Sequence, residues 1–189
     1  MKKSLSAALL AAALCSPWVA HAQESYVKFG VGQGHYSARG ADADQTGASL
    51  AFGQTLTENL GYEIGYTNFG NWSGSMTAGT QTTSVSIRSQ AVYAAVVGNL
   101  PLNESFSLFG KLGASVNYTK GKVSLTDTAA PENNFRDSGS DTKVQPTIGV
   151  GAAYHFNKQL AATVEYQHFG KVEGDLKLSA WTIGVKYGF

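Results

Sequence analysis

The last nine residues read Trp181-Thr182-Ile183-Gly184-Val185-Lys186-Tyr187-Gly188-Phe189, with bulky apolar side chains at every second position. Alternation with a period of two places successive side chains on opposite faces of a β-strand. One face of this stretch is apolar and aromatic, and the other carries a threonine, a lysine and two glycines. The stretch therefore predicts a strand between an apolar and a polar environment.

The same alternation recurs along the chain, in segments of about ten residues that turn signals separate. We expect the other seven strands at about 25–37, 46–56, 60–70, 84–98, 105–119, 143–156 and 160–172. In 84–98 the alternation assigns Ala91, Tyr93 and Val97 to the apolar face and Arg88 to the polar face. Helical periodicity is absent, and after the first 22 residues no run of about 18 apolar residues predicts a membrane helix.

The connections between these segments alternate in length. Those at 57–59, 99–104 and 157–159 are short, whereas longer ones rich in Gly, Ser, Thr, Asp and Asn are expected at 38–45, 71–83 and 120–141, with a smaller one near 173–176. Short turns on one side and longer loops on the other are typical of an eight-stranded, antiparallel, up-and-down transmembrane β-barrel. A water-soluble barrel or sandwich shares the period of two, but aromatic residues near the strand ends favour the membrane barrel.

The composition agrees with this prediction. The 189 residues include Lys+Arg 14 and Asp+Glu 13, so the electrostatic signature of a nucleic-acid-binding protein is absent. Only 14% of the residues are charged and 22 are glycines, which suits a narrow lumen that side chains fill.

Residues 1–22 have the features of a cleaved signal peptide. Lys2 and Lys3 precede a short apolar run, and Ala20-His21-Ala22 provides small residues for cleavage. A lipoprotein signal at Cys15 is the alternative, but Leu14 precedes the cysteine where a small residue is required. Cleavage after Ala22 leaves 23–189 as one barrel domain without cysteine, beyond the inner membrane of a Gram-negative bacterium.

Four motifs resemble the small outer-membrane β-barrel family, which comprises the transmembrane domain of OmpA and relatives such as OmpX, Ail and OmpW. They are Leu56-Thr-Glu-Asn-Leu-Gly-Tyr-Glu-Ile-Gly-Tyr66, Gly149-Val-Gly-Ala-Ala-Tyr-His-Phe156, Tyr166-Gln-His-Phe-Gly170 and the C-terminal stretch. The resemblance implies an outer-membrane location, contact with membrane lipid and lipopolysaccharide, and recognition by the barrel assembly machinery. The implied assembly signal consists of Trp181, Ile183, Val185, Tyr187 and Phe189. The chain ends at this strand, so we do not expect the periplasmic peptidoglycan-binding domain of full-length OmpA or its anchoring to the wall.

Six charged residues are predicted to face the lumen: Lys28, Glu63, Arg88, Lys111, Glu165 and Lys186. Isolated charges are costly in a narrow lumen, so they should pair. We expect Glu165 near Lys186 and Lys28, and Glu63 near Arg88 or Lys111. A static network that fills the lumen is the favoured interpretation, and a switchable gate in a minor ion channel is the alternative.

The longer loops are the second candidate site. Trp72, Lys122 and Arg136 lie in them and are predicted to contact a host surface protein or a neighbouring cell, in adhesion or serum resistance. The alternative is a solvated loop without a partner. A weak repeat, 100 residues apart, also relates Phe69-Gly70 to Phe169-Gly170 and indicates one structural task performed twice.

An enzyme is the least favoured function. Some eight-stranded barrels modify lipid A with a histidine, a serine and an acid near the outer rim, and His35, Ser37 and His168 fall in that region. However, strands one and seven are separated by strand eight, and no acid is apparent in matching phase. No nucleotide-binding loop or metal-ligand spacing occurs, so we expect no catalytic residue, cofactor or metal.

Overall fold

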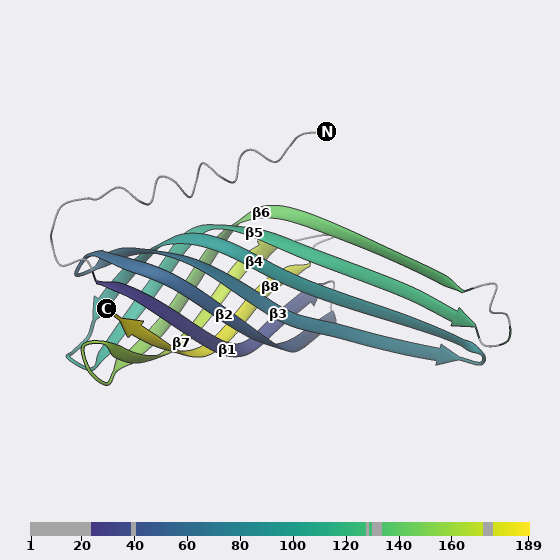
Figure 1. Cartoon of the computed structure of the whole chain (residues 1–189), viewed down its shortest axis with the longest axis horizontal. Helices are drawn as coiled ribbons and strands as arrows, with labels where there is room; N and C mark the ends of the chain where they lie inside the picture. The colour runs from purple at the N-terminus through teal and green to yellow at the C-terminus, as the bar shows by residue number, and fades with distance from the viewer. Residues whose placement is uncertain (1–23, 39–40, 128, 130–133, 172–175) are drawn as a thin grey trace.

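The computed structural model describes residues 24–38, 41–127, 129, 134–171 and 176–189, and the expected signal peptide lies outside them. Eight antiparallel strands close into a barrel (Figure 1), which confirms the predicted fold. The strands are β1 Ser25–Ala38, β2 Ala41–Thr57, β3 Leu60–Ala78, β4 Gln81–Pro101, β5 Phe106–Asp127, β6 Phe135–His155, β7 Leu160–Lys171 and β8 Lys177–Gly188. In the described part of the chain, no helix has the length and apolar character to cross a bilayer.

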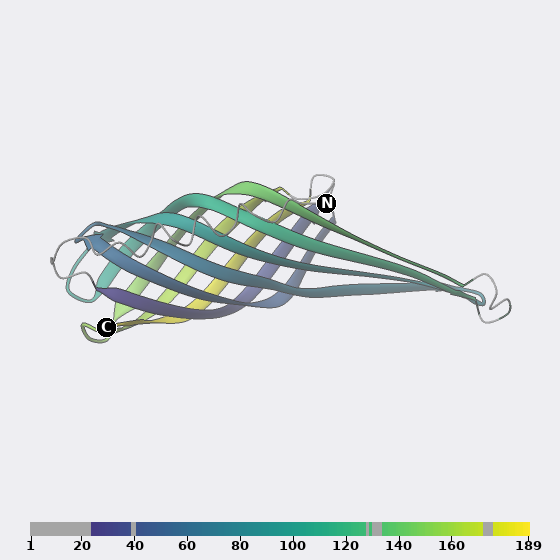
Figure 2. The same cartoon turned by 45° about the horizontal axis from the view of Figure 1, so that its top comes forward.

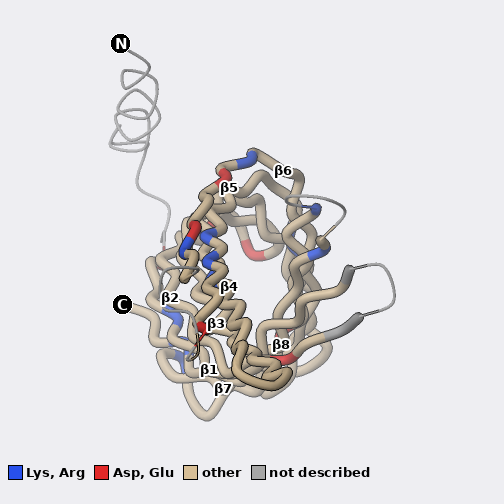
Figure 3. Tube along the Cα trace, turned by 90° about the vertical axis from the view of Figure 1, so that its right-hand side faces the viewer, with Lys and Arg blue, Asp and Glu red and all other residues tan. Residues whose placement is uncertain are grey.

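The C-terminal strand closes the barrel. The ladder between β8 and β1 runs from the pair Tyr26–Gly188 to the pair Ser37–Lys177. Beyond it, the Phe189 N–H donates to the Ser25 carbonyl at 2.9 Å, and the Ser25 N–H donates back at 3.2 Å. The closed ring of strands is visible end-on in Figure 3. A closed sheet leaves no unpaired strand edge, which is the condition for a β-structure in lipid.

The barrel wall is apolar outside and polar inside. On β5, Leu112 is 66% exposed on the outer face, whereas Lys111 and Asn117 are buried in the lumen. The predicted phases of 105–119, 143–156 and 181–189 agree with the structure, with the bulky apolar residues outward.

The predicted phase of β4 is wrong. Tyr93 and Val97 are buried inside the barrel, and Val92 and Val96 are more than half exposed outside. Residues 91–97 are apolar in both phases, so the sequence offers no contrast between faces. The opposing strand settles the phase, because a Cβ on Gly65 would lie 2.4 Å from Tyr93 Cζ. The missing side chain makes room for the tyrosine ring inside.

An aromatic cluster fills the lumen at the end of the barrel that is far from the short turns before β3 and β7, toward the long-loop side. The Phe69 and Phe169 rings are fully buried and meet edge to face, with centroids 5.0 Å apart. Each phenylalanine precedes a glycine with positive φ, 85° at Gly70 and 79° at Gly170, and each lies where the strand register shifts. The 100-residue repeat is thus an inward phenylalanine followed by a glycine bulge, made twice.

Four strands continue beyond the barrel as a sheet that we call the arm: residues 71–78 of β3, 81–88 of β4, 120–127 of β5 and 135–142 of β6 (Figures 1 and 2). The β3–β4 ladder extends to Ala78–Gln81 and the β5–β6 ladder to Leu125–Phe135, whereas the β2–β3 ladder stops at Ala48–Asn68. The loops predicted at 71–83 and 120–141 are therefore mostly strand. The predicted loop 38–45 is also largely strand, because β2 begins at Ala41. Serine, threonine and glycine suggested loops, but threonine is a good strand residue and cross-strand pairing overrides the weak propensities.

Candidate functional site

The structure brings four of the six predicted lumen charges into one closed quartet. Lys28, Glu63, Lys111 and Glu165 come from β1, β3, β5 and β7, because inward residues of alternate strands meet in one layer of a small barrel. Lys28 Nζ lies 2.5 Å from Glu165 Oε2 and 3.3 Å from Glu63 Oε2. Lys111 Nζ lies 2.5 Å from Glu63 Oε1 and 2.6 Å from Glu165 Oε1. Each lysine thus contacts both carboxylates, and the charges balance.

Three aromatic residues complete this lumen site. The Tyr26 hydroxyl donates to Glu63 Oε2 at 3.0 Å, and the Tyr93 hydroxyl donates to Glu63 Oε1 at 2.6 Å. The ammonium groups of Lys28 and Lys111 each lie 5.6 Å from the Phe109 ring centroid. Buried charges need such additional partners, because desolvation otherwise outweighs their mutual attraction. Neither Tyr26 nor Phe109 stands out in the sequence as a lumen residue, and Tyr93 was assigned to the wrong face.

The other two predicted lumen charges lie elsewhere. Arg88 is exposed on the outer face of β4, which follows from the corrected phase of that strand. Lys186 faces inward but stacks on Tyr26, with Nζ 4.1 Å from the ring centroid. Glu165 pairs with Lys28, as predicted, and with Lys111, but not with Lys186, the other partner that the sequence suggested.

Only small cavities border the quartet, although a wider opening of about 760 Å³ lies at the short-turn end beside Asn99 and Lys186. A cavity of about 20 Å³ borders Lys28, Glu63 and Lys111, and one of about 10 Å³ borders Glu165 below Phe169. Each is no larger than roughly one water molecule requires. Side chains of the quartet and its neighbours therefore occupy the middle of the lumen.

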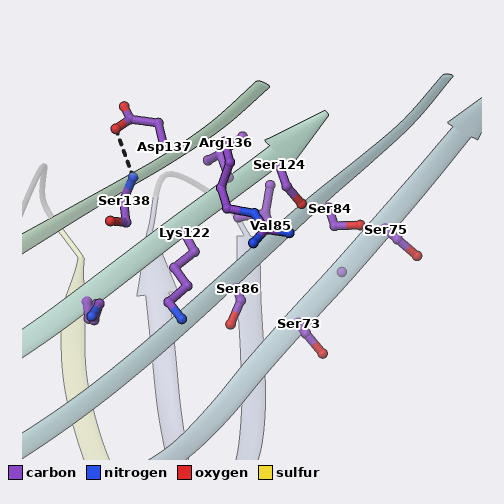
Figure 4. Close-up of a pocket in the computed structure, with 13 residues that line it drawn as sticks. Ser73, Ser75, Ser84, Val85, Ser86, Lys122, Ser124, Arg136, Asp137 and Ser138 are labelled. Carbon is purple, nitrogen blue, oxygen red and sulfur yellow. Dashed lines mark hydrogen bonds between the residues drawn. The ribbon is translucent and has the colours of Figure 1, made fainter. Parts of the chain in front are cut away.

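The outer face of the arm carries a polar, basic groove of about 870 Å³ (Figure 4). Its cations are Lys120, Lys122 and Arg136, and Asp137 lies at its rim with Oδ1 accepting from the Ser138 N–H. Hydroxyl groups from all four strands line it: Ser73, Ser75, Ser84, Ser86, Ser124 and Ser138. The register sets these side chains opposite one another, for example Ser86 beside Lys122 and Lys122 beside Ser138.

The residues predicted as loop contacts therefore lie on strands. Lys122 and Arg136 belong to the groove, but Trp72 is opposite Ile87 on the other face of the arm. That face continues the barrel lumen and carries apolar residues such as Val123 together with Asp137 and Asp141. The basic face continues the apolar outer wall. On β5 the outer face changes from apolar to basic between Tyr118, which is 42% exposed, and Lys120. This change marks the limit of the apolar wall.

A row of polar residues lies at the same outer end of the barrel, on the side of the wall formed by β1, β7 and β8. Ser179 on β8 lies directly between His35 on β1 and His168 on β7, and Asp44 Oδ1 lies 2.6 Å from His35 Nδ1. The expectation that no acid lies in matching phase is therefore wrong, and Ser179 was not anticipated, because only the ladder register aligns these residues. Ser179 is 5% exposed, so a substrate carbonyl does not reach its hydroxyl in this conformation. The row contains the residue types of a nucleophilic triad, but its serine hydroxyl is not accessible to a substrate.

A closed barrel with an apolar outer wall, a filled polar lumen and short turns at one end defines a transmembrane β-barrel. The chain belongs to the outer membrane protein beta-barrel domain family, whose sequence profile matches residues 6–189. It lies in the outer membrane of a Gram-negative bacterium, and in such barrels the short turns face the periplasm, so the arm projects outward.

The chain is similar in sequence to outer membrane protein A of several bacteria. It is 28% identical over 152 residues to outer membrane protein A of Yersinia pseudotuberculosis, matching 77% of this chain and 40% of that protein. It is also 28% identical over 143 residues to outer membrane protein A of Serratia marcescens, covering 76% of this chain. The chain thus spans about two-fifths of the length of these relatives.

The similar solved structures share the fold. Ail of Yersinia pestis, in complex with the heparin analogue sucrose octasulfate, has a TM-score of 0.63 at 20% identity, covering 88% of this chain and 99% of Ail. Neisserial surface protein A has a TM-score of 0.58 at 15% identity, covering 87% of this chain and 97% of that protein.

Proposed function

We propose that this chain is a surface-display protein whose barrel anchors the arm and whose arm groove binds polyanionic glycans in adhesion. The observation that carries the proposal is the groove itself. Among the described residues that line it, three are cationic and one is acidic, and the remaining polar groups are serine hydroxyls. Cations and hydroxyl donors on a shallow surface match the regularly spaced sulfate or phosphate groups of an acidic polysaccharide.

A relative of the same fold supports this ligand class. Ail was solved with sucrose octasulfate, a heparin analogue, and its fold covers 88% of this chain. The support is by analogy of fold, so the binding of sulfated glycans by this chain rests on its own groove residues. A host surface protein is the alternative partner, and serum resistance is the alternative outcome.

The experiment compares heparin binding by the folded barrel with that of the double variant Lys122→Gln/Arg136→Gln. Two lost charge-assisted contacts should weaken binding about tenfold or more, and added salt should weaken the wild type further. Lys158→Gln removes an exposed cation from the turn at the other end and serves as the matched control. Equal affinity of wild type and double variant, or an equal loss in the control, would refute the proposal. Cells carrying the double variant then report adhesion and serum survival.

We further infer that the lumen is structural and that the chain is not an enzyme. The quartet is charge-balanced, and the cavities beside it are about 20 and 10 Å³. The ion channel remains the second candidate, because each lysine contacts both carboxylates and pairs could exchange. A lipid A profile that is unchanged on deletion of the gene is expected, and an altered acylation pattern would support the enzyme.

A further inference from the structure

The lumen is wider at its short-turn end than in its middle. The opening of about 760 Å³ at this end is lined by Thr55, Asn99, Ser107, His155 and Lys186, among others. A second space, of about 60 Å³, shares His155 and Lys186 with the opening and also borders Ala161. The second space alone is several times the room that one water molecule needs. We call the two spaces together the vestibule, and because short turns face the periplasm in such barrels, it is reached from the periplasm.

The lysines beside the vestibule and the quartet outnumber the carboxylates that pair with them. The quartet is neutral, since two lysines share two glutamates. Lys186 is a third inward lysine, and the ladder sets it directly opposite Lys28 of the quartet. Its ammonium group lies over the Tyr26 ring, and among the described residues it has no ion pair. An unpaired charge is costly inside a narrow lumen, so Lys186 favours an anionic partner.

Two exposed carboxylates, Glu24 and Glu58, stand at the rim of the vestibule. Glu24 precedes β1 in the same inward phase as Tyr26 and Lys28, and it is close enough to act on Lys186 through its charge. An anion that enters from the periplasm therefore passes two like charges before it reaches the lysine. This rim disfavours a multiply charged anion more strongly than an anion with a single charge.

Donor groups flank the position that a single anionic group would take. His155 on β6, Ala161 on β7 and Lys186 on β8 form one rung of the sheet. Neighbouring strands are about 4.8 Å apart, so the backbones of His155 and Lys186 lie about 10 Å apart, with only a methyl side chain between them. Ser107 Oγ lies 2.9 Å from His155 Nε2 and holds the imidazole ring. A carboxylate fits this arrangement, because one oxygen can accept from the ammonium group and the other from the imidazole or the hydroxyl.

We propose that the vestibule binds a carboxylate group that enters from the periplasm, with Lys186 as its cationic partner and His155 and Ser107 as further donors. The group belongs to a free small acid or to the carboxyl end of a peptide, which share this chemistry. Once it is bound, three carboxylates balance three lysines in this part of the lumen. The vestibule and the arm groove lie at opposite ends of the molecule, so the inference does not depend on the proposed glycan binding.

The test is a titration of the full barrel in phosphatidylcholine nanodiscs, followed by NMR chemical shifts of its backbone amides. The probes are acetate, N-acetylated dialanine with a free carboxylate, and the same dipeptide as its carboxyl-terminal amide. Shifts should concentrate around His155, Ala161 and Lys186. Lys186→Gln should weaken binding of the carboxylates about tenfold or more, because a charge-assisted contact is lost. Lys186→Arg keeps the charge and should retain most of the binding, and Glu24→Gln should tighten binding because a repelling rim charge is gone.

The control is Lys177→Gln, which makes the same change at the other end of β8 and should bind the probes like wild type. Binding of acetate identifies a free acid as sufficient, whereas binding of the dipeptide alone identifies a peptide end, and either supports the site. The proposal is overturned if neither carboxylate binds or if the amide binds as tightly as the acid. It is also overturned if folded Lys186→Gln keeps its affinity.

Glu24→Gln keeps the proposal testable if Lys186→Gln does not fold, since unchanged or weaker binding in Glu24→Gln contradicts the charge argument. Heparin binding separates this proposal from the proposed function. Lys186→Gln lies away from the arm groove and should bind heparin like wild type, so failure of the vestibule and failure of the groove are distinguishable.

Discussion

Glu63 is the residue on which the polar lumen depends most. Its two carboxylate oxygens accept from two lysines and two tyrosines, with distances from 2.5 to 3.3 Å. Glu63→Gln keeps the shape but removes the charge, which leaves the two buried lysines with one carboxylate. We expect a loss of about 3 kcal/mol in the free energy of unfolding. Urea unfolding in lipid vesicles, followed by tryptophan fluorescence, measures it.

Glu58→Gln is the matched control, because Glu58 is an exposed carboxylate in the turn before β3. The control should change the free energy of unfolding by less than about 0.5 kcal/mol. Equal effects of the two substitutions would mean that the quartet contributes nothing specific.

The coupling within the quartet gives a second prediction. Lys111→Met alone should leave the carboxylates underpaired, but adding it to Glu63→Gln restores the charge balance with one lysine and one carboxylate. We expect the double variant to be more stable than the sum of the single losses predicts, by about 1 to 3 kcal/mol. A double-mutant cycle of urea unfolding free energies measures this difference. Strictly additive losses would contradict a coupled network.

At the residue scale, the sequence predicted which charges turn inward better than which charges meet. Lys28, Glu63, Lys111 and Glu165 were assigned inward from alternation alone. The predicted pairs Glu165–Lys28 and Glu63–Lys111 are present, but the sharing of both carboxylates by both lysines follows from the layer that the odd-numbered strands form, which the sequence does not reveal. Arg88 was misplaced because β4 is apolar in both phases, and Tyr93 was misplaced for the same reason.

The glycine bulges are the feature to test at the scale of elements. Gly170 has a φ of 79°, and a Cβ there would lie 2.7 Å from Gln145 Cβ. Gly170→Ala should therefore cost about 1 to 3 kcal/mol, through backbone strain and displacement of Gln145. Gly121→Ala is the control, since nothing lies within 4 Å of a Cβ at Gly121 and its φ is ordinary. The midpoints of urea unfolding of the two variants compare them directly, and equal midpoints would argue against a strained bulge.

The C-terminal strand gives a prediction about assembly. Its apolar side chains face outward, with Phe189 64% exposed, while the Phe189 backbone pairs with Ser25. We expect deletion of Phe189 to reduce insertion in cells, through loss of recognition by the assembly machinery, and to affect refolding in detergent less. The amount of heat-modifiable barrel in isolated outer membranes measures insertion. Unchanged insertion would mean that the strand acts only as barrel wall.

The arm shows why the number of strands could be predicted from the sequence but the ends of β3, β4, β5 and β6 could not. Eight strands follow from eight alternating segments, each crossing the membrane once. The arm strands carry Ser73, Ser75, Ser84 and Ser86 in alternation with Gly74 and Val85, a contrast too weak to be read as a sheet with two faces. They are strands because each extends a ladder that the membrane-spanning part has already set in register.

At the scale of the whole molecule, two separate groups of side chains block the lumen at different depths. The quartet closes the middle of the barrel, and the ring cluster around Phe69 and Phe169 closes it toward the arm. A path for ions would require both to open, since the cavities between the side chains hold roughly one water each. Wild-type protein in planar bilayers should therefore show no steady conductance. Glu165→Ala should also stay closed, because it leaves the aromatic cluster intact, whereas a switchable salt-bridge gate predicts that this variant opens. Single-channel recordings of both proteins at the same protein-to-lipid ratio decide between the two, and steady openings in Glu165→Ala would restore the channel as the better function.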